Sequence, residues 1–141
     1  SVYGGNGILG KHNEFFIKDS VLIIGRVGAY CGVIHLTEPY SWITDNALYI
    51  TEFKKETNSK FLKLSMDCLN LNTYAKTGGQ PSISQSTIHK LKIPLPSLEV
   101  QEQIVTEIES EQKAVEECKK LIEKMQKKIE AKIKEVWGDS E

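Results

Sequence analysis

Apolar and polar residues follow one pattern up to residue 96 and a different one after it. In the first part, short apolar runs are separated by glycine, proline and asparagine, which favour turns. Residues 20–26 (SVLIIGR) form a continuous apolar run ended by glycine, which predicts a buried strand. Residues 31–36 and 47–51, rich in Val, Ile, Tyr and Thr, predict two more strands. The first part of the chain therefore predicts a β-rich body.

One helix and several short segments complete the predicted body. Between residues 58 and 74 the apolar side chains recur at a spacing nearer to helical than to alternating. This spacing predicts a helix, ended by the turn Thr77-Gly78-Gly79. The remaining predicted segments are a short strand over residues 82–84, a turn or short helix over 87–91, and an extended stretch over 92–95.

A proline step separates this body from a single long helix. Pro94 and Pro96 fix φ and push the residues before them towards extended conformations, so no helix runs through them. Ser97 then offers an N-cap oxygen, and Glu99 lies in the first turn, where the helix dipole favours negative charge. Residues 98–137 contain neither proline nor glycine. The predicted fold class is therefore α+β, a β-rich domain followed by one long C-terminal coiled-coil-like helix.

The helix carries an apolar stripe. Its steps alternate between three and four residues, apart from a gap at Glu111 and one extra step of four near the end. About 40 residues at ~1.5 Å each make a rod of roughly 60 Å, longer than a body of this size can cover. A helix folded back along its own domain would cover one end only, so we expect pairing with another helix. The residues expected to pair are Ile104, Ile108, Val115, Ile122, Met125, Ile129 and Ile133, and the stripe also includes Cys118 and Val136.

Charge divides the chain in the same place as the apolar pattern. The net charge of −1 combines +3 over residues 1–96 with −4 over residues 97–141. A basic body beside an acidic helix favours phosphates as partners of the first and protein as the partner of the second. No apolar run approaches the roughly 18 residues that a membrane helix needs, and three scattered cysteines without C-x-x-C spacing fit reduced thiols in the cytoplasm. Because the first residue is Ser1 within a glycine-rich segment, we expect the domain to be truncated at its N-terminus.

Residues 78–104 hold the most informative motifs. They read GGQPSISQSTIHKLKIPLPSLEVQEQI and contain a G-x-Q-x-x-I-S element, an I-P-x-P step and an E-x-Q-x-x-I helix start. In this combination the segment closely resembles the end of a target-recognition domain in specificity subunits of type I restriction-modification enzymes. Ser97 departs from the family pattern, which usually has another proline there. Weaker similarity near residues 3–12 and 24–28 extends the resemblance over essentially the whole chain.

The resemblance implies a division of labour between two parts. Residues 1–96 would be the DNA target-recognition domain, and residues 97–141 the conserved helix that acts as spacer and dimerisation element. In the family, each domain recognises one half of a bipartite site in double-stranded DNA, and two such helices pair antiparallel. A methyltransferase subunit supplies S-adenosylmethionine chemistry, and a restriction subunit can join. The chain would be part of a specificity subunit, or the C-terminal recognition part of a fused N6-adenine methyltransferase.

The first candidate DNA contacts lie in the glycine-rich segment over residues 2–12. Tyr3, Asn6, Lys11 and His12 are placed among four glycines that let a loop approach a groove or phosphate closely. A glycine turn in a β-hairpin is the alternative. A Y-G-x-x-G-x-x-G segment is recurrent in the recognition domains that the chain resembles, and this favours the DNA interpretation.

Further candidates surround two other glycine turns. Arg26 ends a strand in Ile24-Gly25-Arg26-Val27-Gly28 and can fork onto a guanine or clamp a phosphate; an ion pair with Asp19 or Asp45 is an equally weighted alternative. The other expected contacts are polar side chains near the second turn: Lys76, Gln80, Ser82, Ser84 and Gln85.

The sequence offers little for catalysis. Asp45, Glu52 and Lys54 fit the D…E-x-K spacing of metal-dependent nucleases only loosely, a pattern that chance produces readily in a chain with 26% charged residues. Neither a histidine or cysteine metal-ligand spacing nor an adenine-methylase motif is visible. We therefore expect a non-catalytic specificity module without its own cofactor or metal. A helix-mediated interaction module without DNA contact is the competing hypothesis.

Overall fold

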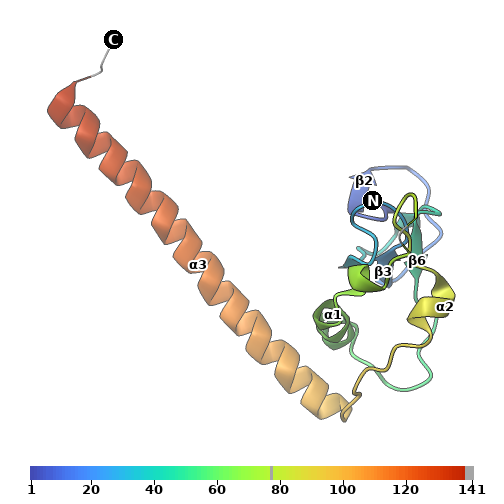
Figure 1. Cartoon of the computed structure of the whole chain (residues 1–141). Helices are drawn as coiled ribbons and strands as arrows, with labels where there is room; N and C mark the ends of the chain where they lie inside the picture. Colours follow the sequence, from blue (N-terminus) through green and yellow to red (C-terminus); the bar gives the residue numbers. More distant parts are fainter. Residues whose placement is uncertain (77, 139–141) are drawn as a thin grey trace. The chain divides into compact units, whose positions relative to one another are not determined.

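A computed structural model describes residues 1–76 and 78–138 and divides the chain into two compact units, Ser1–Glu102 and Gln103–Glu141. The first unit, called the body below, contains short strands and small helices, and the second consists of most of one long helix (Figure 1). This arrangement confirms the predicted α+β class with a long C-terminal helix. In the described part of the chain, no helix is both long and apolar enough to span a membrane.

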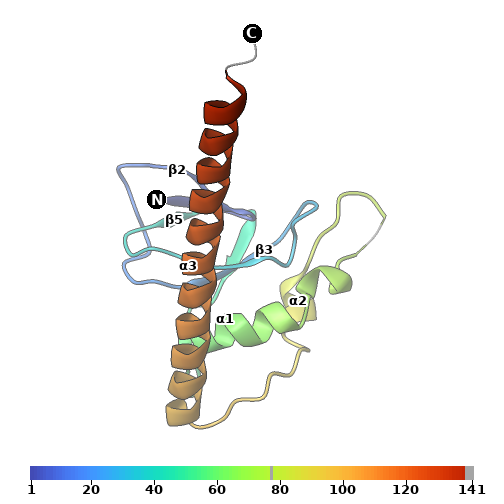
Figure 2. The ribbon, with the colours of Figure 1, turned by 90° about the vertical axis from the view of Figure 1, so that its left-hand side faces the viewer.

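The body contains two three-stranded sheets (Figure 2). In the first, β1 (Val2–Gly4) pairs antiparallel with β2 (Gly7–Gly10) and parallel with β5 (Trp42–Ile43). In the second, β3 (Leu22–Gly25) lies between β4 (Ile34–Leu36) and β6 (Ala47–Tyr49), antiparallel to both. The segments predicted at 20–26, 31–36 and 47–51 thus contain strands, whereas β1, β2 and β5 were not among the predicted strands.

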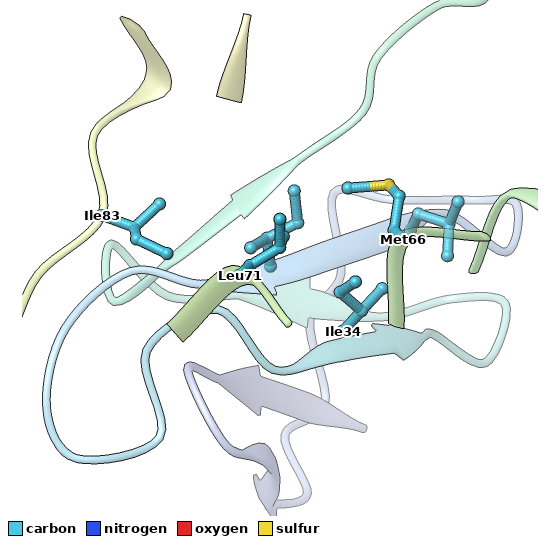
Figure 3. Packing of buried hydrophobic residues seen from close by; sticks show 6 residues of the cluster. Ile34, Met66, Leu71 and Ile83 are labelled. Carbon is cyan, nitrogen blue, oxygen red and sulfur yellow. The ribbon is translucent and has the colours of Figure 1, made fainter. Parts of the chain in front are cut away.

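Strand β3 accounts for the continuous apolar run in residues 20–26. Its side chains alternate between two faces, and both faces are buried. Leu22 and Ile24 belong to the larger core cluster, whereas Ile23 belongs to a second cluster with Tyr3, Ile43 and Ala47. The larger cluster also contains Ile34, Met66, Leu71 and Ile83, which come from four separate segments of the chain and converge on β3 (Figure 3).

The helix predicted between residues 58 and 74 is shorter than expected. Helix α1 spans Ser59–Cys68, and its N-cap Asn58 accepts hydrogen bonds from the backbone N–H groups of Lys60 and Phe61. Asn70 has a left-handed backbone (φ 48°), which ends the helical path, and a 3-10 helix, η1 (Leu71–Tyr74), follows. The predicted stop at Thr77-Gly78-Gly79 is therefore wrong, although Thr77 itself lies outside the described residues. The helix ends earlier than predicted because asparagine tolerates the left-handed region.

Of the three short segments before the long helix, the first two differ from the prediction. Residues 82–84 form no strand: Ser82 makes isolated bridges to Val27 and Lys76. Helix α2 occupies Gln85–Ile88, two residues earlier than the predicted turn, because Ser84 caps it by accepting from the N–H of Thr87. Residues 92–95 belong to no helix or strand.

Helix α3 runs over Leu98–Trp137, as the absence of proline and glycine predicts. Its start is held by Gln101, which is completely buried. The side-chain Nε2 of Gln101 donates to the carbonyl of Pro96 (2.9 Å), and its Oε1 accepts from the N–H of Asn58 (2.9 Å). The glutamine of the E-x-Q-x-x-I motif therefore ties the proline step to the cap of α1. Ser97 contributes its carbonyl, which accepts the N–H of Gln101 (3.0 Å).

Candidate nucleic-acid interface

The tip of the β1/β2 hairpin lies against the end of β3. Gly5 and Gly25 make this approach possible, because a Cβ at Gly5 would lie 2.8 Å from the carbonyl oxygen of Asn46 and one at Gly25 would collide with the carbonyl of Gly5. The glycine-rich segment thus forms the hairpin that was weighed as an alternative. The hairpin also brings the exposed Asn6 next to the strand end that carries Arg26.

Arg26 is fixed through its backbone and exposed through its side chain. Its N–H donates to the carbonyl of Asn46 (2.9 Å), and its carbonyl accepts from the N–H of Ile83 (2.9 Å). Over residues 1–76 and 78–138, no salt bridge joins Arg26 to Asp19 or Asp45. The structure therefore gives no support to the ion-pair alternative, and the guanidinium is available to an external anion.

The second glycine turn lies beside Arg26. The N–H of Gly28 donates to the carbonyl of Pro81 (2.8 Å), and the N–H of Lys76 donates to the carbonyl of Ser82 (2.9 Å). The side-chain amide of Gln80 also reaches Gly28, since a Cβ there would lie 3.9 Å from Gln80 Nε2. Five predicted residues from three separate segments of the chain therefore gather around one strand end: Asn6, Arg26, Lys76, Gln80 and Ser82. We call these residues the Arg26 cluster.

The other predicted contacts are not in this cluster. Tyr3 is 4% exposed, lies in the second core cluster and accepts the N–H of Glu38 on its hydroxyl (2.9 Å). The assignment of Tyr3 to the DNA surface therefore does not fit the structure: alternation along β1 turns this side chain inward. Ser84 serves α2 instead, because its hydroxyl bonds the hydroxyls of Ser86 (2.8 Å) and Thr87 (2.9 Å). Gln85 is exposed at the start of α2, at the rim of an apolar cavity of about 590 Å³.

Lys11 and His12 are exposed at the opposite end of the hairpin. The strand register pairs Val2 with Gly10 at that end and Gly4 with Gly7 at the tip. The imidazole of His12 accepts the N–H of Glu14 on Nδ1 (3.1 Å) and lies 6.1 Å from the ring of Trp42. Exposed aromatic rings surround this end: Phe15, Phe16, Tyr40, Trp42 and Tyr49. The structure thus separates Lys11 and His12 from the Arg26 cluster.

One residue beside the Arg26 cluster was not predicted. Tyr30 is 62% exposed, and its carbonyl lies close to Gly25, since a Cβ there would be 3.1 Å away. An exposed aromatic ring can stack on a sugar or an unpaired base. Its signal in the sequence is an aromatic side chain in the short loop that follows I-G-R-x-G.

The described residues offer few groups for metal binding or acid–base catalysis. Residues 1–76 and 78–138 contain no group of three His, Cys, Asp or Glu side chains that would hold a metal ion. Asp45, Glu52 and Lys54 of the loose nuclease pattern are all exposed. Burial, followed by the positive charge of Lys63, lowers the pKa of His35 below its usual 6.5, which keeps this imidazole neutral under the hairpin near Gly7.

The body thus presents a strand-end cluster of polar and basic groups and is followed by a long helix, an arrangement that fits a recognition domain. The family of type I restriction modification DNA specificity domains matches residues 2–132, and the chain belongs to this family. The chain is also similar to the specificity subunit of the type I restriction enzyme EcoprrI from Escherichia coli. The two are 31% identical over 99 residues, which cover 70% of this chain and 24% of the relative. The chain thus spans about a quarter of the length of that relative.

Proposed function

We propose that residues 1–96, the part of the body before α3, read one half of a bipartite site in double-stranded DNA. The observation that carries this proposal is the Arg26 cluster. It combines an arginine and a lysine with two amide side chains on a frame of backbone hydrogen bonds. Arginine and lysine suit guanine edges and phosphates, and Asn and Gln suit adenine. Membership in a family of DNA specificity domains supports the same conclusion.

We also propose that α3 is the spacer between two such half-sites. Its described part exposes a stripe of large apolar side chains, among them Val115, Ile122 and Ile129, each more than half exposed. A second helix would cover this stripe. A methyltransferase partner would then supply S-adenosylmethionine chemistry at the DNA that the body selects, and a restriction subunit could join the same assembly. The name of the E. coli relative, a specificity subunit of a restriction enzyme, supports such a role.

The test compares lysines inside and outside the Arg26 cluster. Arg26→Ala should weaken binding to the cognate duplex by about 1–3 kcal/mol if it reads a guanine. Lys76→Ala should weaken binding to all duplexes and reduce the salt slope by about one unit. Lys11→Ala is the matched control, because Lys11 is also exposed but lies at the other end of the hairpin.

Fluorescence anisotropy with a labelled duplex of the natural target, measured at several salt concentrations, gives these values. Loss of affinity in Lys11→Ala alone would move the interface to the aromatic end of the hairpin. Absence of salt-dependent duplex binding in the parent protein would instead favour the competing hypothesis of a pure interaction module.

A further inference from the structure

The charges on α3 change sign along the helix. Its first half, residues 98–117, carries seven acidic residues and one lysine, whereas its second half, residues 118–137, carries seven lysines and three acidic residues. Two copies paired in parallel would oppose acid to acid and lysine to lysine. Two copies paired antiparallel would oppose each acidic half to a basic half.

The apolar stripe repeats with a regular heptad that two charged residues interrupt. Strictly alternating steps of four and three from Ile104 place Glu111 and Lys132 among the core positions, and they place Ile133 beside Lys132 at the edge of the seam. Both charged residues are exposed, and Lys132 pairs on its own helix with Glu135 (2.6 Å) at side-chain exposures of 69% and 67%. Such an exposed pair contributes little and exchanges readily for another partner.

We infer that Glu111 and Lys132 select one antiparallel register for a second copy of this chain; the inference rests on the proposed pairing of α3. In this register Cys118 faces Ile122 of the second copy, and Val115 faces Met125. One turn further out, Glu111 faces Ile129, and Ile108 faces Lys132. Glu111 of each copy then lies one core layer, about 5 Å along the axis, from Lys132 of the other copy. Opposite charges in neighbouring layers attract each other in a partly desolvated seam.

The neighbouring registers lack this match. A shift by one heptad in one direction would place Lys132 opposite Gln101, which is completely buried in the body. A shift in the other direction would leave Ile104 and Ile108 without partners. Only the inferred register uses the stripe from Ile104 to Val136 in full. It also places Leu121, which flanks the stripe and is 53% exposed, against Leu121 of the second copy.

Some flanking contacts oppose the register without deciding it. Lys119 would face Lys119 of the second copy, and Glu107 would approach Glu135 of the second copy. These positions lie at the edge of the seam, where long side chains spread into water and like charges cost little. The seam positions of Glu111 and Lys132 are closer to the partner helix, so their charges dominate the choice of register.

Charge exchange tests the inference. Glu111→Lys and Lys132→Glu should each weaken self-association about tenfold, because each places like charges in neighbouring layers. The double variant Glu111→Lys/Lys132→Glu should restore the parent affinity, and so should an equimolar mixture of the two single variants. Sedimentation equilibrium gives the dimer dissociation constants. Glu109→Lys, which changes the same charge outside the heptad core, is the matched control.

Disulfide trapping tests the register itself. In a Cys68→Ser background, Ile122→Cys should cross-link to Cys118 of the second copy about tenfold faster than Val115→Cys, because facing core residues alone come within disulfide distance. Faster cross-linking of Val115→Cys, or of Cys118 with itself, would overturn the register. If the dimer dissociation constant is unchanged by both charge variants, the inferred register is wrong, but the proposed pairing of α3 still holds. A parent protein that remains monomeric would overturn both.

Discussion

The body and the long helix use the same residue type for opposite purposes. Ile23 in β3 is fully buried in the second core cluster, whereas Ile122 in α3 is 57% exposed. The body covers its apolar side chains by folding segments that lie far apart in sequence onto one strand. The described part of α3 instead presents its stripe to solvent. We therefore expect that stability within one chain and the proposed association between chains can be changed separately.

The strongest test of this separation breaks association and spares the body. Ile122→Asp together with Ile129→Asp would bury charge in the pairing seam, and each isoleucine would forgo about 1.5–3 kcal/mol of burial. We expect loss of the dimer in sedimentation and an unchanged melting temperature of the body. In a Trp137→Phe background, Trp42 fluorescence reports on the body alone. A fall in body stability equal to the loss of association would contradict the separation.

The reverse test damages the body and spares the helix. Ile23→Ala would leave a cavity within the second core cluster and should lower the free energy of unfolding by roughly 2–5 kcal/mol. Urea denaturation followed by Trp42 fluorescence measures this loss. Ile129→Ala is the matched control, because it removes the same atoms from an exposed position. Equal effects of the two substitutions on unfolding would show that the helix stripe is also part of the core.

A smaller effect is expected where the body meets the first turn of α3. Gln101→Ala would leave the carbonyl of Pro96 and the N–H of Asn58 without their partner, at a cost of about 1–3 kcal/mol. The control is Gln103→Ala, two residues further along and exposed. Urea denaturation should show the loss for Gln101→Ala only. Hydrogen exchange at the Asn58 amide should rise in the same variant; unchanged protection there would exclude the bridge.

The smallest expected effect concerns pH. Because burial lowers the pKa of His35 below 6.5, the unfolded chain takes up this proton more readily than the folded one. The neutral imidazole's contribution is complete above pH 6.5 and declines as pH falls towards the lowered pKa. His35→Gln should therefore reduce the loss of stability on going from neutral to mildly acidic pH. Melting curves across that range, with His89→Gln as the exposed control, would detect the difference; identical pH profiles of parent and His35→Gln would refute it.

The sequence predicted those elements whose signals are local. The apolar run around Leu22 and the unbroken helix after Pro96 each carry their own pattern, and both were found where expected. The short strands β1, β2 and β5 have no such pattern, because they are stabilised by partners far away in the chain. Helix α1 ended early because Asn70 adopted a left-handed backbone, a choice that its neighbours in sequence do not dictate.

The candidate site shows the same limit. Residue type alone grouped Tyr3 with Asn6 and Lys11. In the hairpin, however, Tyr3 is buried in the core, Asn6 lies at the tip, and Lys11 lies at the opposite end. The approach of Gly5 to Gly25 decided which polar groups meet Arg26. Such contacts depend on the pairing of distant segments. The sequence therefore predicted most members of the cluster, but it could not predict that they lie together.

The backbone frame around Arg26 has a consequence for how such domains diversify. The hydrogen bonds that hold this strand end run from amide to carbonyl and make no demand on the identity of the side chain at position 26, and the bonds that place Lys76 and Ser82 are of the same kind. Exposed side chains here can therefore be exchanged while the scaffold keeps its shape. Substitutions at these few positions would therefore change the proposed base contacts, while the fold that presents them is kept.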